Sequence, residues 1–172
     1  LWVETATRQR ELLLIESSLG SSARTVAELV RELPFEPTRR SDLSELAARA
    51  ARASGVRVTL IAPDGKVVAD SEVTPEDLDG VESHASRPEV AAALAGRTGT
   101  DTRRSDTVGR AFLYLAIPRA APSGSGVVRV AADLSSVDSA VAGLRWALVT
   151  GGVLSLAGAL ALSFFFSRAL LR

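Results

Sequence analysis

The stretch VRVTLIAPDGKVVADS, residues 56–71, decides the fold that the sequence predicts. Its apolar residues Val56, Val58 and Leu60 alternate with polar ones, which is the two-residue period of a β-strand. Pro63-Asp64-Gly65 then supplies the residue types that a tight turn requires, and a second apolar run begins directly after it. These features predict a β-hairpin.

Three further strands are predicted after the hairpin. Residues 100–105 are polar and predict an exposed or edge strand, whereas residues 111–117 form a continuous apolar run that is typical of a central strand. Residues 127–133 are rich in valine and predict a third strand. Pro118 is expected to end the apolar strand, and residues 121–126 are expected to form a flexible surface loop.

Helices are predicted before and after the hairpin. Apolar residues in the region 12–33 alternate at spacings of three and four, which is a heptad seam. Such a helix either pairs with a partner helix or packs on its own domain, and Pro34 ends it. A second helix is expected to begin with a capping box formed by Asp42 and Glu45. Short helical segments are expected near residues 76–78 and after Arg87-Pro88-Glu89.

Residues 135–172 have a different character. There is no charged residue between Arg145 and Arg168. A run of roughly 22 residues spans about 33 Å as a helix, which is enough for the hydrocarbon core of a membrane. We therefore predict a signalling helix that continues as a transmembrane span over about residues 146–167. A row of small residues permits close contact with a partner helix, and comprises Gly143, Ala147, Gly151, Ser155 and Ala159.

The predicted domains are residues 4–134, an extracytoplasmic domain, and residues 135–172. Residues 1–3 are either the end of a first transmembrane helix or an exposed N-terminus, because Trp2 is typical of a membrane interface. The formal net charge is zero, which gives no electrostatic indication of nucleic-acid binding. The absence of cysteine excludes disulfides, a thiolate zinc site and a cysteine nucleophile.

The candidate residues for chemistry are few. The single histidine, His84, has no metal-ligand partner at a suitable spacing, so hydrogen bonding near a helix start is the simpler interpretation. Arg103, Arg104 and Arg110 either contact an anionic ligand or lipid headgroups, or form a charged edge that discourages aggregation. A group of acids lacks the spacing of a calcium loop and predicts a solvated face: Asp64, Asp70, Glu72, Asp77 and Asp79. We predict no catalytic residue, metal or cofactor in this chain.

Four blocks of sequence, residues 60–71, 84–90, 112–118 and 128–130, together resemble a known family. They are similar to the extracytoplasmic sensor domain of bacterial two-component histidine kinases of the phosphate-regulon and cell-wall-sensing type. The resemblance covers the chain from about Val56 to the end of the predicted span. The positions that carry the family motif are Asp64, Gly65, Asp70, Ser71, His84, Arg87, Pro88, Glu89, Tyr114 and Pro118.

The resemblance implies an α+β fold of the PAS-like, or single Cache, type. This fold has an antiparallel five-stranded sheet with helices on one side, here with a long N-terminal helix and a C-terminal helix that continues as the span. In such domains the segment between the second and third strands, here residues 72–98, borders the ligand pocket. A HAMP linker, a phosphoacceptor domain and an ATP-binding kinase domain would follow in the parent protein.

The resulting hypothesis is a sensory input module in the bacterial inner membrane. Its expected partners are a second copy of the chain and an unknown envelope or small-molecule signal. Residues of about 4–145 are expected outside the cytoplasm, with the C-terminus inside, and the absent kinase core would act on a response regulator. Two alternatives stay open: the input domain of a chemoreceptor or diguanylate cyclase, and a non-enzymatic bitopic membrane protein that binds another chain.

Overall fold

The computed structural model describes residues 2–104, 110–122 and 124–134, and in the C-terminal part residues 149–153, 155 and 158. Side chains are described from residue 9 onward, except at residue 11. The chain divides into two compact units, residues 1–133 and residues 134–172, which are considered separately.

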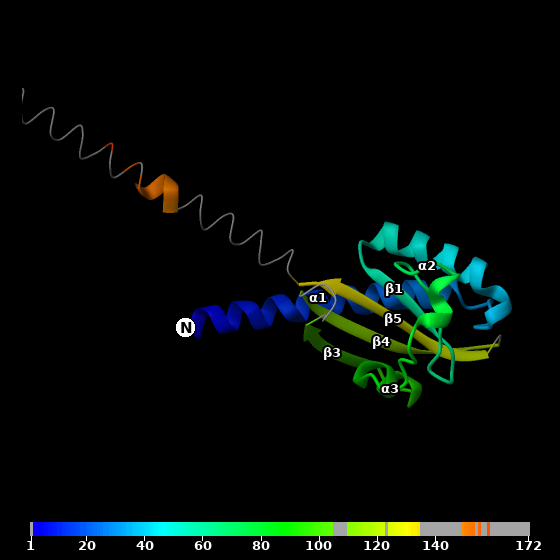
Figure 1. The fold of residues 1–172 in the computed structure, drawn as a ribbon. Helices are drawn as coiled ribbons and strands as arrows, with labels where there is room; N and C mark the ends of the chain where they lie inside the picture. The colour runs from blue at the N-terminus through cyan, green and yellow to red at the C-terminus, as the bar shows by residue number, and fades with distance from the viewer. Residues whose placement is uncertain are drawn as a thin grey trace, which may run out of the picture. The chain divides into compact units, whose positions relative to one another are not determined.

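The first unit is built on a five-stranded antiparallel sheet with the strand order β2-β1-β5-β4-β3 (Figure 1). This confirms the predicted hairpin and the α+β sheet architecture. The elements in chain order are α1 (Trp2–Leu29), the 3₁₀ helix η1 (Pro37–Arg39), α2 (Arg40–Ser54), β1 (Arg57–Ile61), β2 (Val67–Asp70), the 3₁₀ helix η2 (Asp77–Gly80), α3 (Pro88–Leu94), β3 (Gly99–Arg104), β4 (Ala111–Ala121) and β5 (Gly124–Asp133).

One face of the sheet is covered by α1, which packs on β4 and β5, and by α2, which packs on β1 and β2. The buried stripe of α1 consists of Leu19, Ala23 and Val26, and continues to Val30 just past its end. The C-terminal half of the predicted seam therefore packs on its own domain. The predicted seam is wrong at Leu29, which is 56% exposed, because Val30 occupies the core position instead.

The start of α2 differs from the expected capping box. The helix begins at Arg40, directly after η1. The N-cap residue, Arg39, makes no side-chain capping hydrogen bond. Asp42 lies inside the first turn, where it accepts a hydrogen bond from Arg39 Nη1 at 3.0 Å. The proline-initiated turn of η1 thus starts the helix earlier than the acid spacing indicates. Gly55 ends the helix with a φ of 70°, as the sequence predicts.

Strand β4 is an interior strand, as its apolar sequence predicts, although β5 is the middle strand of the sheet. It does not end at Pro118, because its pairing with β5 continues to Ala121 opposite Gly124. Pairing of β4 with β3 stops at Ala116, so the missing N–H of Pro118 costs no hydrogen bond on that side. The predicted flexible loop is therefore a tight hairpin connection between β4 and β5.

The opposite face of the sheet is covered by residues 71–98, which join β2 to β3 and contain η2 and α3 (Figure 1). These residues are called the covering segment. The expectation that all helices lie on one side is thus wrong, because a short apolar helix between two strands can close the second face. Below this segment lies an apolar cluster of Ile61, Val67, Leu78, Val90, Ala93, Ala116 and Val127. Most of the other residues on this sheet face are polar, with Phe112 and Ala131 as apolar residues among them.

Beyond Leu134, the second unit is described only at residues 149–153, 155 and 158, which are helical. Among the described residues, no helix has both the length and the apolar character needed to cross a membrane. The predicted span at 146–167 lies mostly outside those residues and stays a prediction. Of the row of small residues, only Gly151 and Ser155 are described.

Candidate functional site

The candidate site is the polar half of the sheet face under α3 and the β2–β3 segment. Residues directly opposite each other in neighbouring antiparallel strands point to the same face. The register places Asp70 of β2 opposite Thr59 of β1, and Thr59 opposite Arg129 of β5. The polar half comprises Arg57, Thr59, Asp70, Asp101, Arg103, Tyr114 and Arg129, with His84 and Glu89 contributed by the covering segment.

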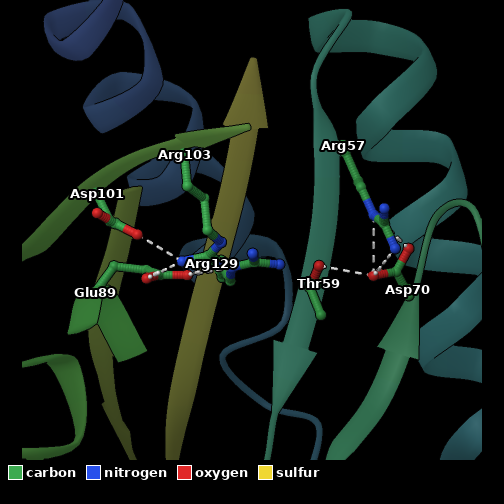
Figure 2. A network of polar contacts seen from close by, with 7 residues as sticks. All are labelled: Arg57, Thr59, Asp70, Glu89, Asp101, Arg103 and Arg129. Carbon is green, nitrogen blue, oxygen red and sulfur yellow. Dashed lines mark hydrogen bonds and ion pairs between the residues drawn. The ribbon is translucent and has the colours of Figure 1, made fainter. Parts of the chain in front are cut away.

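Glu89 is the centre of one ion cluster in this half (Figure 2). Its carboxylate is 0% exposed and accepts two hydrogen bonds from Arg103, Nη1 to Oε2 and Nη2 to Oε1, both at 3.0 Å. Arg129 Nε donates to Oε1 at 2.9 Å. Burial alone would raise the pKa of Glu89, but the hydrogen bonds from Arg103 and the charge of Arg129 outweigh it and lower that pKa. Glu89 is therefore held as a carboxylate.

Asp70 is the centre of a second cluster on the same sheet face, at the edge formed by β2 (Figure 2). It is 3% exposed and accepts hydrogen bonds from Arg57 Nε at 3.0 Å and from Thr59 Oγ1 at 2.8 Å. The backbone N–H of Glu72 donates to Oδ1 at 2.9 Å. Burial alone would lower the pKa of Arg57. The negative charge of Asp70 and the hydrogen bonds that Arg57 donates to it outweigh burial and raise that pKa. Arg57 therefore stays charged.

Tyr114 lies among the guanidinium groups of the first cluster. The Cζ atoms of Arg103 and Arg129 stand 4.1 and 4.2 Å from the centroid of its ring. Both are within the distance at which a cation is attracted to the face of an aromatic ring. Phe112, on the same strand, has its ring centroid 6.0 Å from that of Tyr114. The ring therefore holds both guanidinium groups in orientation toward Glu89.

His84 lies over the polar half, within electrostatic reach of both clusters. Burial, with the positive charges of Arg129 and Arg87, lowers its pKa to about 4, so the ring is neutral at physiological pH. Its backbone N–H donates to Gly65 O at 2.9 Å. Its Nδ1 atom is buried and has no hydrogen-bond partner among the described residues. An unsatisfied buried nitrogen calls for a specific explanation, and a bound molecule is one.

Two glycines allow the covering segment to approach the sheet and its hairpin. Gly65 has a φ of 84°, and a Cβ there would overlap Ala85, directly after His84. A Cβ on Gly99 of β3 would clash with the carbonyl oxygen of Glu89 and approach Ala92 to 2.8 Å. The positions of His84 and Glu89 over the sheet therefore depend on these two glycines.

Among the predicted arginines, Arg103 does not form an exposed charged edge, because its side chain folds inward to Glu89 and Asp101 and is 25% exposed. Arg110 pairs with Asp133 at 2.9 Å near the protein surface, and Arg104 is exposed. The structure thus brings only one of the three arginines into the candidate site.

The expectation of a solvated acidic face is wrong for Asp70, which is buried because Arg57 and Thr59 satisfy it. Asp79 is exposed, and its hydrogen bonds and attraction to Arg40 lower its pKa to about 2. The remaining acids serve local structure or pair at the surface. Asp64 accepts from Lys66 N, Asp77 accepts from Thr74 Oγ1, and Glu72 pairs with Arg57.

The other motif positions support the covering segment rather than line the polar half. Arg87 is the residue before α3, and its N–H donates to His84 O at 3.0 Å. Pro88 begins α3, as its fixed φ favours. Ser71 Oγ accepts from Val58 N at 3.0 Å, and Pro118 lies in β4 beyond its pairing with β3.

Arg129, Arg57, Thr59 and Asp101 belong to the polar half but were not singled out from the sequence. One signal was available for Arg129, because it interrupts the valine-rich strand β5. A charged residue inside a buried strand requires a partner of opposite charge. The identity of that partner, 40 positions away at Glu89, depends on the fold.

No protein-family model and no curated protein matches the chain. Solved structures with a similar fold include the sensor domain of the V. cholerae histidine kinase DctB, with 17% identity and a TM-score of 0.54 over 80% of this chain and 59% of that one. The ligand-binding domain of the C. jejuni chemoreceptor Tlp3 with 4-methylisoleucine matches at 12% identity and a TM-score of 0.54, over 76% of this chain and 54% of that one.

The E. coli DcuS sensor domain matches at 14% identity and a TM-score of 0.53, over 74% of this chain and 98% of that domain. The chain therefore spans less than two thirds of the DctB and Tlp3 structures but nearly all of the DcuS domain. At these identities the likeness concerns the fold, which is that of PAS-like sensor domains.

The polar half is suited to binding and to rigid positioning. Arg57, Arg103 and Arg129 each have a carboxylate partner, so their charges are balanced within the site. Neutral His84 offers a buried ring nitrogen beside them. Such an arrangement can hydrogen-bond a small polar molecule.

Proposed function

We propose that this chain is the sensory input module of a bacterial membrane-bound two-component histidine kinase of the phosphate-regulon and cell-wall-sensing type. The observation that carries the proposal is the partly buried polar half of the sheet face, covered by a helical segment that contributes His84 and Glu89. A small extracytoplasmic molecule would act there. The fold neighbours support this, since one of them is a chemoreceptor domain in complex with 4-methylisoleucine.

Transmission would run through β5. This strand carries Arg129 in the polar half and ends at Asp133, directly before the segment for which the sequence predicts a signalling helix and a membrane span. A ligand that changes the position of β5 would displace that helix and, through a HAMP linker, a cytoplasmic kinase that acts on a response regulator. Such a mechanism requires that the ligand bind one of two states more tightly.

The proposed assembly is a homodimer in the inner membrane that pairs through the N-terminal half of α1. Leu13 and Leu14 are 62% and 68% exposed on that half, whereas the C-terminal half of α1 packs on its own sheet. Exposed leucines on a helix surface are typical of a helix that binds another chain.

Cysteine crosslinking in membranes tests the proposed transmission, because the natural chain has no cysteine. Leu13→Cys reports on α1 and Ser139→Cys on the predicted signalling helix. We expect crosslinking between copies at one or both positions to change between activating and silent conditions. Identical crosslinking in both conditions would contradict the mechanism. An exposed site on α2, Arg52→Cys, is the control for random collision.

The similarity to the Tlp3 domain favours a second candidate, the input domain of a chemoreceptor. The two candidates share the sensory fold and differ in the output that follows it. The coding sequence beyond Arg172 distinguishes them, since a HAMP linker followed by a histidine-containing phosphoacceptor domain supports the kinase and a long methyl-accepting helical domain supports the chemoreceptor.

A further inference from the structure

The Glu89 carboxylate sits in surroundings that resemble a binding site for a free carboxylate. It receives a paired contact from Arg103, with both nitrogen-to-oxygen distances at 3.0 Å, and a third hydrogen bond from Arg129 at 2.9 Å. Paired guanidinium-to-carboxylate contacts of this kind are the geometry by which proteins bind carboxylate ligands. Tyr114 holds both guanidinium groups in place.

The two arginines are built into the sheet, whereas Glu89 belongs to the covering segment. Arg129 lies in β5 and Arg103 in β3, while Glu89 is in the first turn of the seven-residue helix α3. The carboxylate and its receptors therefore come from separate layers of the domain. Among the described residues, Glu89 is the carboxylate that contacts both guanidinium groups.

We propose that Glu89 is an internal ligand, which fills a carboxylate-binding site formed by Arg103, Arg129 and Tyr114. The inference deepens the proposed sensory function and rests on it for its biological meaning. The signal molecule of this sensor does not present a carboxylate to that arginine pair, because the position is filled by a carboxylate fixed in the chain. A molecule that binds the polar half uses His84 and the remaining polar groups instead.

Removing the internal carboxylate tests this. Glu89→Ala deletes the side-chain atoms that sodium acetate can replace, and Glu89→Gln is the matched control because it keeps the volume filled without the charge. All measurements use the whole chain in a neutral detergent at pH 7. Acetate is compared with chloride at equal sodium concentration. The melting temperature and the NMR signal of a ring-labelled tyrosine are recorded, since Tyr114 is the single tyrosine of the chain.

For Glu89→Ala we expect 100 mM acetate to raise the melting temperature by about 4 °C more than chloride does, as for a ligand present at about ten times its Kd. The Tyr114 signal should shift with acetate and saturate. The natural chain and Glu89→Gln should show no acetate-specific change in either measurement.

Equal responses of Glu89→Ala to acetate and chloride would overturn the proposal. If this variant is unfolded in chloride, recovery of its circular dichroism in acetate supports the proposal, and failure to fold in both salts counts against it. A saturable Tyr114 shift in the natural chain with acetate, succinate or phosphate would also overturn it, because the site would then be open. These outcomes are independent of whether the chain is a sensor.

Discussion

Arg119 connects the C-terminal end of α1 to the β4–β5 hairpin. Its Nη2 atom donates to the carbonyl oxygens of Val30, Arg31 and Leu33 at 3.0, 2.8 and 2.6 Å. Its Nη1 atom donates to Gly124 O at 3.1 Å, and the side chain is 3% exposed. The carbonyl groups that Nη2 contacts lie in the turn that follows Leu29, the last residue of α1, and a cation beyond the C-terminus of a helix interacts favourably with the helix dipole. We therefore expect Arg119 to stabilise the domain strongly.

The change Arg119→Met keeps an apolar stem and removes every donor. The buried Val30 carbonyl also accepts a hydrogen bond from Leu33 N at 3.1 Å, so the loss of its bond to Arg119 costs about 1 kcal/mol. The other three acceptors are partly open to water, so each lost bond costs about 1 kcal/mol. The free energy of unfolding should fall by about 4 kcal/mol, which corresponds to about 10–15 °C in melting temperature for a domain of this size.

Thermal unfolding of the whole chain in neutral detergent, followed by circular dichroism, measures this loss. Arg110→Met is the matched control, because it removes an arginine that pairs with Asp133 but whose own side chain is 55% exposed. Its effect should stay below about 1 kcal/mol. Arg119→Lys should lie between the two, since an ammonium group reaches fewer of the acceptors. A melting temperature of Arg119→Met within about 3 °C of the natural chain would refute the reasoning.

Three further changes have defined outcomes in the same unfolding assay. Gly99→Ala should cost about 2–3 kcal/mol because its Cβ meets the backbone of α3, whereas Gly80→Ala, with open space around it, should cost little; equal effects would contradict the close packing. Asp70→Asn should cost about 2–3 kcal/mol, because Arg57 keeps only its exposed partner Glu72 and Thr59 loses a charged acceptor, whereas Asp79→Asn at the surface should have little effect. The pKa of His84 falls from 6.5 to about 4 on folding, so the unfolded chain takes up the proton first and stability decreases as the pH drops through that range. His84→Asn should remove about 1–2 kcal/mol of that decrease after allowance for partial exposure, and an unchanged pH profile would contradict it.

Local sequence signals predicted most of the elements. The turn residues at 63–65 predicted the β1–β2 hairpin, and Gly55 predicted the end of α2, because these residues act on the backbone beside them. The prediction that Pro34 ends the first helix was wrong by five residues, because α1 ends at Leu29 and turns follow it. The prediction that Pro118 ends its strand was wrong. A proline interrupts a strand only where a neighbouring strand would need the N–H that proline lacks, and β3 no longer pairs with β4 at this position. That information is absent from the local sequence.

The candidate site was less accessible from the sequence. The family resemblance marked Asp70, His84, Glu89 and Tyr114, and the charge pattern marked Arg103, but the sequence did not indicate which of these residues pair. The contact of Arg129 with Glu89 joins positions 40 residues apart, and it exists only once the strand register and the docking of α3 are set. Charged residues that look exposed in a linear pattern become buried when such a pair forms.

A screen of small polar molecules against the ring-labelled chain addresses the sensory site itself. The panel contains neutral and cationic compounds, with mono- and dicarboxylates for comparison, and the Tyr114 signal reports on the polar half. We expect a compound that raises the melting temperature to shift this signal in a saturable way, and we expect His84→Ala to weaken its binding at least about tenfold, the loss of one or two hydrogen bonds. A stabilising compound that leaves the Tyr114 signal unchanged and binds His84→Ala equally well would contradict a ligand site in the polar half.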